Sequence, residues 1–294
     1  MKITPLAEAQ RRARTVAVGT FDGVHLGHRE VIVGADTVLT FDPHPMSVIS
    51  PKGTPLLLTT TERKAELLAG LGVEELIVVS FDAEFAARSA DQFIDQVLVD
   101  GIGVEEVRVG GNFRFGHKAQ GNPESLLADD RFKTTVVPLF ELDGETVSSN
   151  RIRQLIEAGD VATAGRLLGT PFLYSGKVEH GEERGRELGY PTANINPRAG
   201  FCTPGRGVYT GRAELDDGSS YIAAISVGLR PMFESQLGLQ VEAFLLDFEG
   251  DLYGRLLRVE FPEWLRGEAS FDSVDALVEQ MAKDVEMARA RVGL

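Results

Sequence analysis

The segment Thr15-Val-Ala-Val-Gly-Thr-Phe-Asp-Gly-Val-His-Leu-Gly-His28 joins a short β-branched run to a loop with three glycines and two histidines. The run predicts a strand, and the loop after it turns into a helix. Free backbone N–H groups and the positive end of a helix dipole then lie at the loop, which favours a bound phosphate. Glycines at such a place let the backbone approach a triphosphate closely. The segment therefore predicts an α/β domain with an anion site at the end of its first strand.

The rest of the first half alternates strand and helix signals. Thr59 and Glu62 fit a capping box that begins a helix over 64–71, and Ser89 and Gln92 fit another. Further strands are predicted at 37–41, 75–80, 107–109 and 134–138. This alternation predicts a parallel sheet with helices on both faces and a ligand crevice outside the carboxyl ends of the strands.

The pattern changes near residue 170. Two helices are predicted over 150–158 and 161–168, with Asp160 as N-cap of the second and Gly169 at its end. Strand signals without crossover helices follow at 172–178, 208–215, 221–227, 241–248 and 255–261, and then a helix over 274–290. Closely spaced strands predict a small antiparallel β-barrel closed by one C-terminal helix. We therefore expect two domains, residues 1–170 and residues 171–294.

Composition limits the classes of function. Apolar residues make up 43% of the chain and charged residues 25%, as in ordinary globular proteins. The net charge of −14 argues against nucleic-acid binding, which needs a basic face. Cys202 is the single cysteine, and the sequence shows neither a membrane-length apolar run nor the apolar core of an export signal. These features predict a cytoplasmic protein that acts on small molecules, with no membrane or nucleic-acid partner.

Two imidazoles three residues apart, His25 and His28, suit adenylyl transfer to a phosphate. That reaction needs no nucleophile from the enzyme, and its difficulty is the negative charge around the α-phosphorus. Imidazoles, Mg²⁺ and N–H groups can stabilise this charge. Three loops at later strand ends are candidates for the same site: 41–45 with His44, 110–116 with Asn112, and 148–153 with Arg153. Each alone is compatible with an ordinary loop, and their shared edge of the predicted sheet groups them.

Together these segments resemble the FMN adenylyltransferase module of prokaryotic bifunctional riboflavin kinase/FAD synthetases, a branch of the nucleotidyltransferases with a His-x-Gly-His signature. The resemblance implies a Rossmann-like sheet domain of nucleotidyltransferase type, in which His25 and His28 meet the ATP phosphates. It also implies that Asn112 holds a phosphate or metal and that Arg153 helps to bind the triphosphate. The other residues that it places at the nucleotide or flavin are Gly19, Phe21, Asp22, Gly27 and His44.

Two features depart from the family's pattern in this half. Asn150 stands where the family's Ser-Ser-Thr-x-x-Arg motif has threonine, which affects the role of that hydroxyl. The short gap between the first two strands leaves room for only a very short helix, around 27–33. We expect this helix to reshape the wall of the pocket.

A second candidate site lies in the segment Gly185-Arg-Glu-Leu-Gly-Tyr-Pro-Thr-Ala-Asn194. Thr192 and Asn194 alternate as on a strand, so both point to one face and offer oxygens to a hard cation such as Mg²⁺. Glu242 interrupts an apolar strand, and a carboxylate can orient a hydroxyl and accept its proton during phosphorylation. The alternatives are a strand whose polar face meets water and a solvent-facing acid.

These residues, with Gly207-Val-Tyr209 and Asp251-Leu-Tyr-Gly254, resemble the riboflavin kinase barrel that follows the adenylyltransferase in the same family. The resemblance therefore covers nearly the whole chain, in the family's own order. It implies that Thr192 and Asn194 bind Mg²⁺ and nucleotide. It also implies that Glu242 is the catalytic base.

The same resemblance places Gly189 and Pro191 at the nucleotide or flavin. The family commonly has Asn-x-Gly-x-x-Pro-Thr where this chain reads Ser226-Val-Gly-Leu-Arg-Pro-Met232. Because of this departure a second hypothesis is kept: an FMN adenylyltransferase whose barrel binds flavin, or regulates, without kinase activity.

The function expected from the resemblance is the synthesis of flavin cofactors in two steps. Riboflavin and ATP give FMN and ADP at the barrel, and FMN and ATP give FAD and pyrophosphate at the α/β domain, both with Mg²⁺. A fragment of an aminoacyl-tRNA synthetase, which also uses a His-x-Gly-His turn, is the alternative from another enzyme class. That enzyme would need a basic RNA-binding surface and a lysine-rich signature loop, and the sequence has neither.

Overall fold

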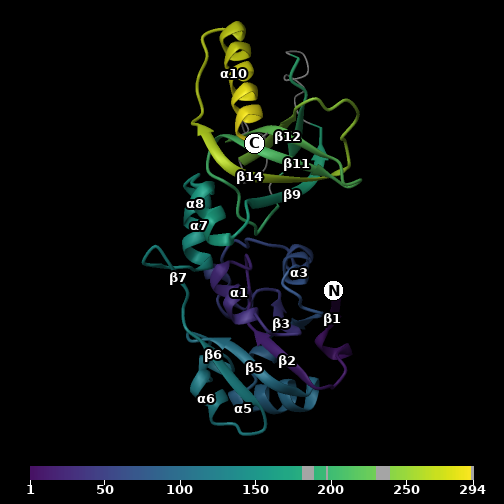
Figure 1. The fold of residues 1–294 in the computed structure, drawn as a ribbon, viewed down its shortest axis with the longest axis vertical. Coiled ribbons are helices and arrows are strands. Elements are labelled where there is room, and N and C mark those ends of the chain that lie inside the picture. The colour runs from purple at the N-terminus through teal and green to yellow at the C-terminus, as the bar shows by residue number, and fades with distance from the viewer. Residues whose placement is uncertain (181–188, 197, 230–238, 293–294) are drawn as a thin grey trace. The chain divides into compact units, whose positions relative to one another are not determined.

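The computed structural model of the chain describes residues 1–180, 189–196, 198–229 and 239–292 (Figure 1). The chain divides into two compact units, Met1–Ser149 and Asn150–Leu294. The two helices before residue 170 lie with the second unit because the later of them, α8 (Val161–Leu168), packs on strands of that unit. The boundary after residue 170 stays a prediction about where one activity ends and the other begins.

The first unit contains a six-stranded parallel sheet in the order β1-β4-β3-β2-β5-β6. Its strands are β1 (Lys2–Pro5), β2 (Arg14–Val18), β3 (Thr37–Asp42), β4 (Glu75–Ser80), β5 (Val104–Gly110) and β6 (Lys133–Val137). The parallel sheet and its five predicted strands are confirmed. The strand β1 was missed, because only Thr4 of its four residues is buried and the segment carries no apolar alternation.

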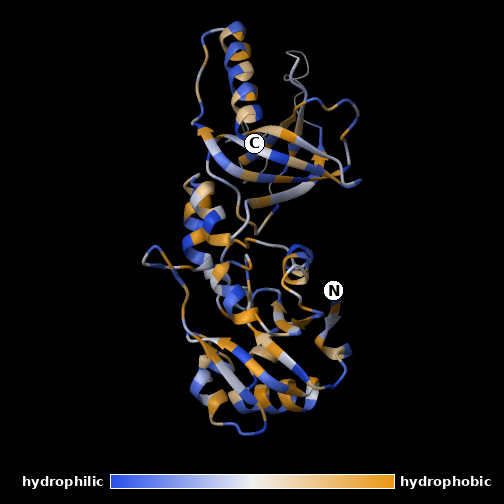
Figure 2. Ribbon diagram, viewed as in Figure 1, coloured by the Kyte–Doolittle hydropathy of each residue, from blue (hydrophilic) through white to orange (hydrophobic). Residues whose placement is uncertain are grey.

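Helices cover both faces of this sheet because the side chains of β2 alternate between two apolar clusters. Val16 and Val18 pack with the helical segment 90–102, whereas Ala17 packs with α1 and α3. The apolar residues of the strands are visible in Figure 2. The helices are α1 (Leu26–Ile32), α2 (Pro45–Ile49), α3 (Thr61–Ala69), α4 (Ala83–Ala86), α5 (Ala90–Gln92) with its continuation η3 (Phe93–Ile102), and α6 (Pro123–Leu127).

Two of the expected helix starts have different outcomes. The capping box of Ser89 and Gln92 is confirmed at the start of α5. The predicted cap at Thr59 is wrong, because Thr60 caps α3 by accepting a hydrogen bond from the backbone N–H of Arg63 at 3.1 Å. Thr59 is engaged elsewhere, since its backbone N–H donates to the carboxylate of Asp22 at 3.2 Å.

The second unit is a closed antiparallel barrel that follows two helices, α7 (Ser149–Glu157) and α8. Asp160 caps α8 and Gly169 ends it in the left-handed conformation, as expected. The barrel order is β10-β13-β12-β11-β14-β9. Its strands are β9 (Phe172–Glu179), β10 (Thr192–Ile195), β11 (Gly207–Leu215), β12 (Ser220–Leu229), β13 (Leu239–Leu245) and β14 (Leu256–Arg266).

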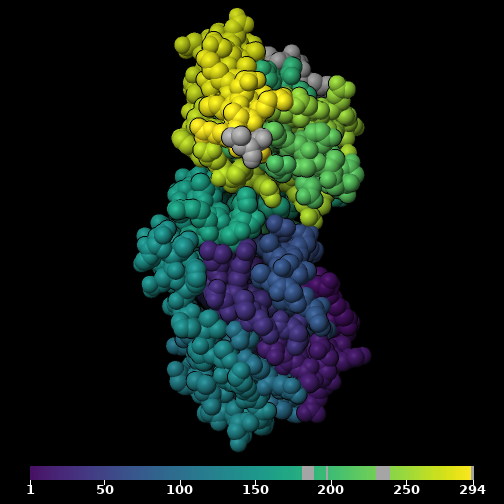
Figure 3. Space-filling model, viewed as in Figure 1, coloured from purple at the N-terminus to yellow at the C-terminus, as the bar shows by residue number. Residues whose placement is uncertain are grey.

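The C-terminal helix α10 (Val274–Val292) packs against β11 and β12 and forms the yellow surface of this unit in Figure 3. The small barrel and its terminal helix are therefore confirmed. The strand expected over 241–248 ends earlier, at Leu245. The physical reason is a turn that follows, in which Asp247 takes a positive φ of 60°.

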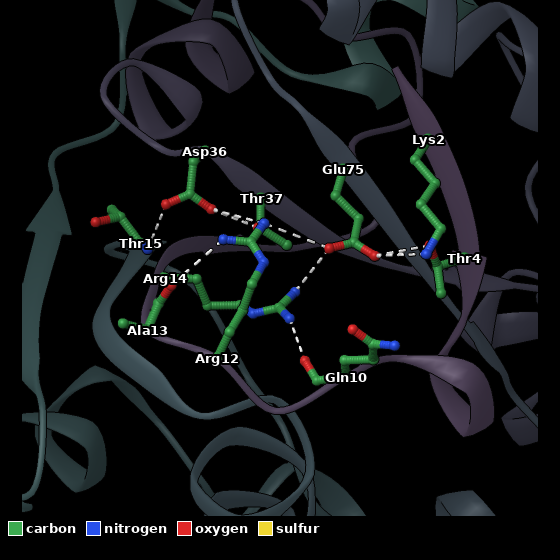
Figure 4. A network of polar contacts seen from close by, with 10 residues as sticks. All are labelled: Lys2, Thr4, Gln10, Arg12, Ala13, Arg14, Thr15, Asp36, Thr37 and Glu75. Atoms are coloured by element: carbon green, nitrogen blue, oxygen red, sulfur yellow. Dashed lines mark hydrogen bonds and ion pairs between the residues drawn. The ribbon is translucent and has the colours of Figure 1, made fainter.

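A buried network of charged groups ties together β1, β2 and β4 at the amino-terminal ends of the strands (Figure 4). The carboxylate of Glu75 accepts hydrogen bonds from the hydroxyl of Thr4 at 2.7 Å and from the guanidinium of Arg14 at 3.0 Å. The Arg14 side chain is 0% exposed. Burial alone would raise the pKa of Glu75, but the Thr4 hydrogen bond and the charges of Arg14, Lys2 and Arg12 outweigh it, so the pKa is lowered.

We predict that Glu75→Gln lowers the free energy of unfolding of the first unit by about 3 kcal/mol at neutral pH, because it leaves the buried Arg14 without its counter-charge. A carboxylate whose pKa is lower in the folded chain than in the unfolded chain stabilises the fold at pH values above its unfolded pKa. This stabilisation is lost as the pH falls through its folded pKa. The variant should therefore lose less stability than the parent on acidification below about pH 4.5.

Urea unfolding followed by circular dichroism across this pH range measures both effects. The matched control is Glu74→Gln, the same change at the exposed neighbouring residue. Equal losses in the two variants would contradict a stabilising role for the network.

Candidate active sites

The loop of residues 19–28, which leaves β2 for α1, is anchored by its own apolar residues. Phe21 and Val24 are buried in the cluster that contains Val31 of α1. Both have positive φ, 47° and 43°, a conformation that costs free energy in residues with a side chain. A Cβ atom at Gly19 would lie only 3.0 Å from the Phe21 ring, so a larger residue would push this ring out of place and glycine is favoured. The loop therefore has one fixed shape at the carboxyl end of β2.

His25 and His28 form a stacked pair at the start of α1. Their ring centroids are 3.6 Å apart with an interplanar angle of 17°. The Nδ1 atom of His25 accepts a hydrogen bond from the backbone N–H of His28 at 3.2 Å and so caps the helix. The rings of Phe21 and His28 form a T-shaped pair, with centroids 5.3 Å apart. The structure thus brings the two predicted histidines together.

The helix α1 is as short as expected, with seven residues. Its C-terminal end is held by β5, because Arg108 donates from Nε to the carbonyl oxygen of Val31 at 3.0 Å. A cation at this end also interacts favourably with the helix dipole. Strand β5 therefore anchors the C-terminal end of the short helix α1. The histidine pair at the start of this helix is held in place as a result.

Two further residues of the predicted site hold the loop in place. The carboxylate of Asp22 accepts hydrogen bonds from the backbone N–H groups of Leu58 and Thr59, at 2.9 and 3.2 Å. A Cβ atom at Gly27 would lie 3.4 Å from the ring of His25, so the backbone passes close to that imidazole. Contact of Asp22 or Gly27 with a ligand stays a prediction.

His44 and Asn112 lie at the ends of the two strands that flank β2, namely β3 and β5. The Nδ1 atom of His44 accepts from the backbone N–H of Met46 at 3.2 Å and caps α2. Asn112 is exposed and lies beside Gly110. Because these strands are parallel neighbours, the three loops share one edge of the sheet, where ligands bind in open α/β folds.

One charged residue of this edge, Lys64, was missed by the sequence analysis. It is buried on α3 and donates from Nζ to the carbonyl oxygen of Thr20 at 2.6 Å and to the hydroxyl of Thr40 at 3.0 Å. Burial lowers the pKa of Lys64 to about 8, although the charges of Asp22 and Asp42 raise it. Its position in the sequence could have indicated that Lys64 is buried, because it falls in the apolar stripe of α3 with Ala65 and Leu68.

A row of phenylalanine rings was also missed. Consecutive rings in the row have centroids between 5.3 and 6.3 Å apart. The members are Phe41, Phe81, Phe85, Phe93, Phe113 and Phe115. Three of them, Phe41, Phe81 and Phe113, lie at or just beyond the carboxyl ends of β3, β4 and β5. The row joins the hydrophobic core, where Phe81, Phe93 and Phe115 are buried, to the edge of the sheet that carries the histidine loop. The rings that are only partly buried are Phe41, Phe85 and Phe113.

Arg153 lies on α7 in the second unit, where it is buried. Its guanidinium donates to the side-chain oxygen of Asn150 at 2.7 Å, so the residue that replaces the family's threonine orients this arginine. The predicted contact of Arg153 with a triphosphate stays a prediction.

The second site is built by the register of the barrel strands. Asn194 of β10 lies opposite Glu242 of β13, and Thr192 lies opposite Phe244. The residues between them, Ala193, Val241 and Ala243, are buried inside the barrel, so the polar residues point outward. The hydroxyl of Thr192 lies 3.4 Å from a carboxylate oxygen of Glu242. The structure thus brings the three predicted kinase residues together on the outer wall.

The neighbours of this cluster add further polar contacts. Gln240 donates from its side-chain amide to the side-chain oxygen of Asn194, which is only 7% exposed. Ser226 of β12 lies opposite Glu242 on the other side and is exposed. Gly189, with a positive φ of 85°, and Pro191 form the turn that leads into β10. Gly185, the first residue of the candidate kinase segment, lies outside the residues that the structure describes. The same holds for Met232, where the chain departs from the family's pattern.

The donor atoms of this cluster fit magnesium. A hydroxyl, an amide oxygen and a carboxylate are hard oxygen ligands, and Mg²⁺ in kinases takes few protein ligands and completes its shell with phosphates and water. Within the described ranges, no group of three or more histidine, cysteine or acidic side chains could hold a metal by itself. The same part of the chain contains no helix that is long and apolar enough to span a membrane.

Two family models match the two halves of the chain. A model described as FAD synthetase matches residues 7–151, and one described as riboflavin kinase matches residues 168–292. Curated relatives match nearly the full length. The chain is 36% identical to the bifunctional riboflavin kinase/FMN adenylyltransferase of Listeria monocytogenes, over 94% of this chain and 92% of the relative. It is 35% identical to the protein of that name from Escherichia coli, over 98% and 96%.

The fold is also similar to that of a solved structure. The crystal structure of a macrolide-efflux protein from Streptococcus pneumoniae superimposes with a TM-score of 0.88 and 31% identity, over 98% of this chain and 99% of the other. Its name describes that protein, whereas both halves of the present chain match models of flavin-synthesising enzymes. The chain belongs to the family of bifunctional riboflavin kinase/FMN adenylyltransferases.

Proposed function

We propose that the barrel phosphorylates riboflavin to FMN and that the first unit adenylylates FMN to FAD, each with ATP and Mg²⁺. The observation that carries the kinase assignment is the strand register that sets Thr192, Asn194 and Glu242 side by side on one outer face. The observation that carries the adenylyltransferase assignment is the stacked pair of His25 and His28 at the start of α1.

At the barrel, Glu242 orients the terminal hydroxyl of the ribityl chain and accepts its proton as the γ-phosphoryl group arrives. Thr192 and Asn194 would hold Mg²⁺ beside it through their side-chain oxygens. When bound, the ion neutralises charge on the transferring phosphate. Gln240 supports this arrangement because its amide already fixes the orientation of the Asn194 side chain.

In the first unit, the FMN phosphate is the nucleophile, so the protein's task is to align the reactants and to stabilise charge. His25 and His28 donate hydrogen bonds to the ATP phosphates, and Asn112 binds a phosphate or the metal. The partly buried rings of Phe41 and Phe113, at the carboxyl ends of β3 and β5, offer apolar surface for the isoalloxazine ring.

A barrel without kinase activity is the weaker alternative. The riboflavin kinase model spans residues 168–292, and the close approach of Thr192, Asn194 and Glu242 on neighbouring strands supports an active barrel. The departure at Ser226 falls on an exposed residue next to Glu242, so it alters the edge of the site and leaves these three side chains in place.

We also propose that the chain works in the cytoplasm on ATP, riboflavin and FMN, without a nucleic-acid partner. The net charge of −14 and the single cysteine support this proposal. A retention assay on a polyanionic resin at low salt would test whether the chain binds nucleic acid. Strong binding would contradict the proposal that it has no nucleic-acid partner.

We predict that Glu242→Gln lowers the rate of FMN formation by about 10²- to 10⁴-fold, the usual contribution of a general base. Glutamine keeps the shape of the side chain, so riboflavin binding and packing change little. FAD formation from supplied FMN should stay near the parent level. Steady-state rates of both reactions measure the effect, and kinase activity within about threefold of the parent would exclude Glu242 as the base.

The converse change is His28→Ala, for which we expect a loss of about 10²- to 10³-fold in FAD formation, because one donor to the developing charge is removed. Riboflavin phosphorylation, in the other unit, serves as the internal control and should be unchanged. A parallel fall of both rates would indicate a folding defect instead of a catalytic role.

The domain boundary after residue 170 predicts that residues 172–294 alone phosphorylate riboflavin. This fragment lacks α8, whose Val161 and Ala164 are buried, and the hydrogen bond from the Gly205 backbone N–H to the Ile156 carbonyl at 2.9 Å. We therefore expect it to unfold at a lower temperature than residues 150–294 while it keeps kinase activity. A folded fragment 172–294 without kinase activity, beside an active longer fragment, would move the functional boundary to the start of the second unit.

A further inference from the structure

Lys64 lies beneath the loop that carries the histidine pair, and the reactions described above do not use it. Its ammonium donates to the carbonyl oxygen of Thr20 at 2.6 Å and to the hydroxyl of Thr40 at 3.0 Å. That hydroxyl donates in turn to the same carbonyl at 3.0 Å. The carbonyl of Thr20, next to Gly19 in the loop, is therefore held both from α3 and from β3.

The hydrogen bonds of Lys64 do not by themselves require an ammonium at this place. Lysine is almost never fully buried unless a charge pairs with it, and both hydrogen-bond acceptors of Lys64 are uncharged oxygens. Burial disfavours the charged form, and the pKa of Lys64 falls to about 8 even though the charges of Asp22 and Asp42 raise it. Methionine has a similar length and would occupy an apolar site at lower cost. The charge is therefore retained for something other than packing.

We propose that Lys64 is a positioning residue for adenylyl transfer, which fixes the carbonyl of Thr20 and with it the loop that presents His25 and His28 to the nucleotide. This inference rests on the proposed function of the first unit. A charge-assisted hydrogen bond is about twice as strong as a neutral one, so the loop is held most firmly while Lys64 is protonated. A shift of about 1 Å in such a support can cost about 10²-fold in rate.

The charged groups that face Lys64 are Asp22 in the loop and Asp42 at the end of β3, and Asp42 also accepts from the hydroxyl of Thr61 at 2.8 Å. His25 and His28 are the other titratable groups of the loop. As the pH rises past about 8, the ammonium of Lys64 loses its proton. FAD formation should then fall with rising pH, and FMN formation at the barrel should not follow this fall.

The test uses the full chain and three variants. Lys64→Met should lower kcat/KM for FAD formation from FMN by about 10- to 10²-fold and abolish its fall above about pH 8, with unchanged riboflavin phosphorylation. Its melting temperature should equal or exceed that of the parent, because both hydrogen-bond acceptors of Lys64 are uncharged and burial of its ammonium costs free energy. Lys64→Arg keeps a charge that does not titrate, so it should show no fall near pH 8. The control is Lys133→Met, the same change at a side chain that is 70% exposed.

Each other result has a definite meaning. FAD formation by Lys64→Met within about threefold of the parent would overturn the proposal, and so would a parent-like fall near pH 8 in Lys64→Arg. A lower melting temperature with equal losses of both activities would show a purely structural lysine and would also overturn it. A parent chain that makes no FAD from FMN would contradict the proposed function itself, before any variant is compared.

Discussion

The burial of Phe21 and Val24 is the constraint on which the first site depends. Both residues have a backbone conformation that side chains disfavour, at a cost of about 1–3 kcal/mol each. Insertion of their side chains into the core cluster offsets that cost. A loop that is over-determined in this way does not need a ligand to take its shape, so the imidazoles are already stacked before a nucleotide arrives.

The two ends of the parallel sheet have different roles. At the amino-terminal ends the charges of Arg14 and Glu75 neutralise each other, which ties the strands together. At the carboxyl ends the polar groups point into loops, and Lys64 is buried there without a direct charged partner among its two hydrogen-bond acceptors. Such a division is expected where one edge of a sheet maintains the fold and the other carries the chemistry.

The sequence was sufficient where chemistry and periodicity coincide. The alternation of Thr192 with Asn194 predicted that these two side chains share a face, and the strand register adds Glu242 to it, opposite Asn194. The sequence was insufficient where contacts between distant parts of the chain determine which residues form a strand or cap a helix. The polar strand β1 forms because β4 offers it a hydrogen-bonding edge, and the choice between Thr59 and Thr60 as helix cap depends on Asp22, a residue far away in the chain. The phenylalanine row needed knowledge of which strands are neighbours.

The outward placement of the kinase residues has a consequence for how this barrel can evolve. Along β13, Val241 and Ala243 fill the interior while Glu242 between them faces outward. A slip of one residue in this strand would turn the carboxylate into the apolar interior and expose the valine. Insertions and deletions within β13 are therefore selected against twice, once by the hydrophobic interior and once by the reaction. Lineages that diverge from this sequence should vary in length in their turns and keep the number of residues in this strand.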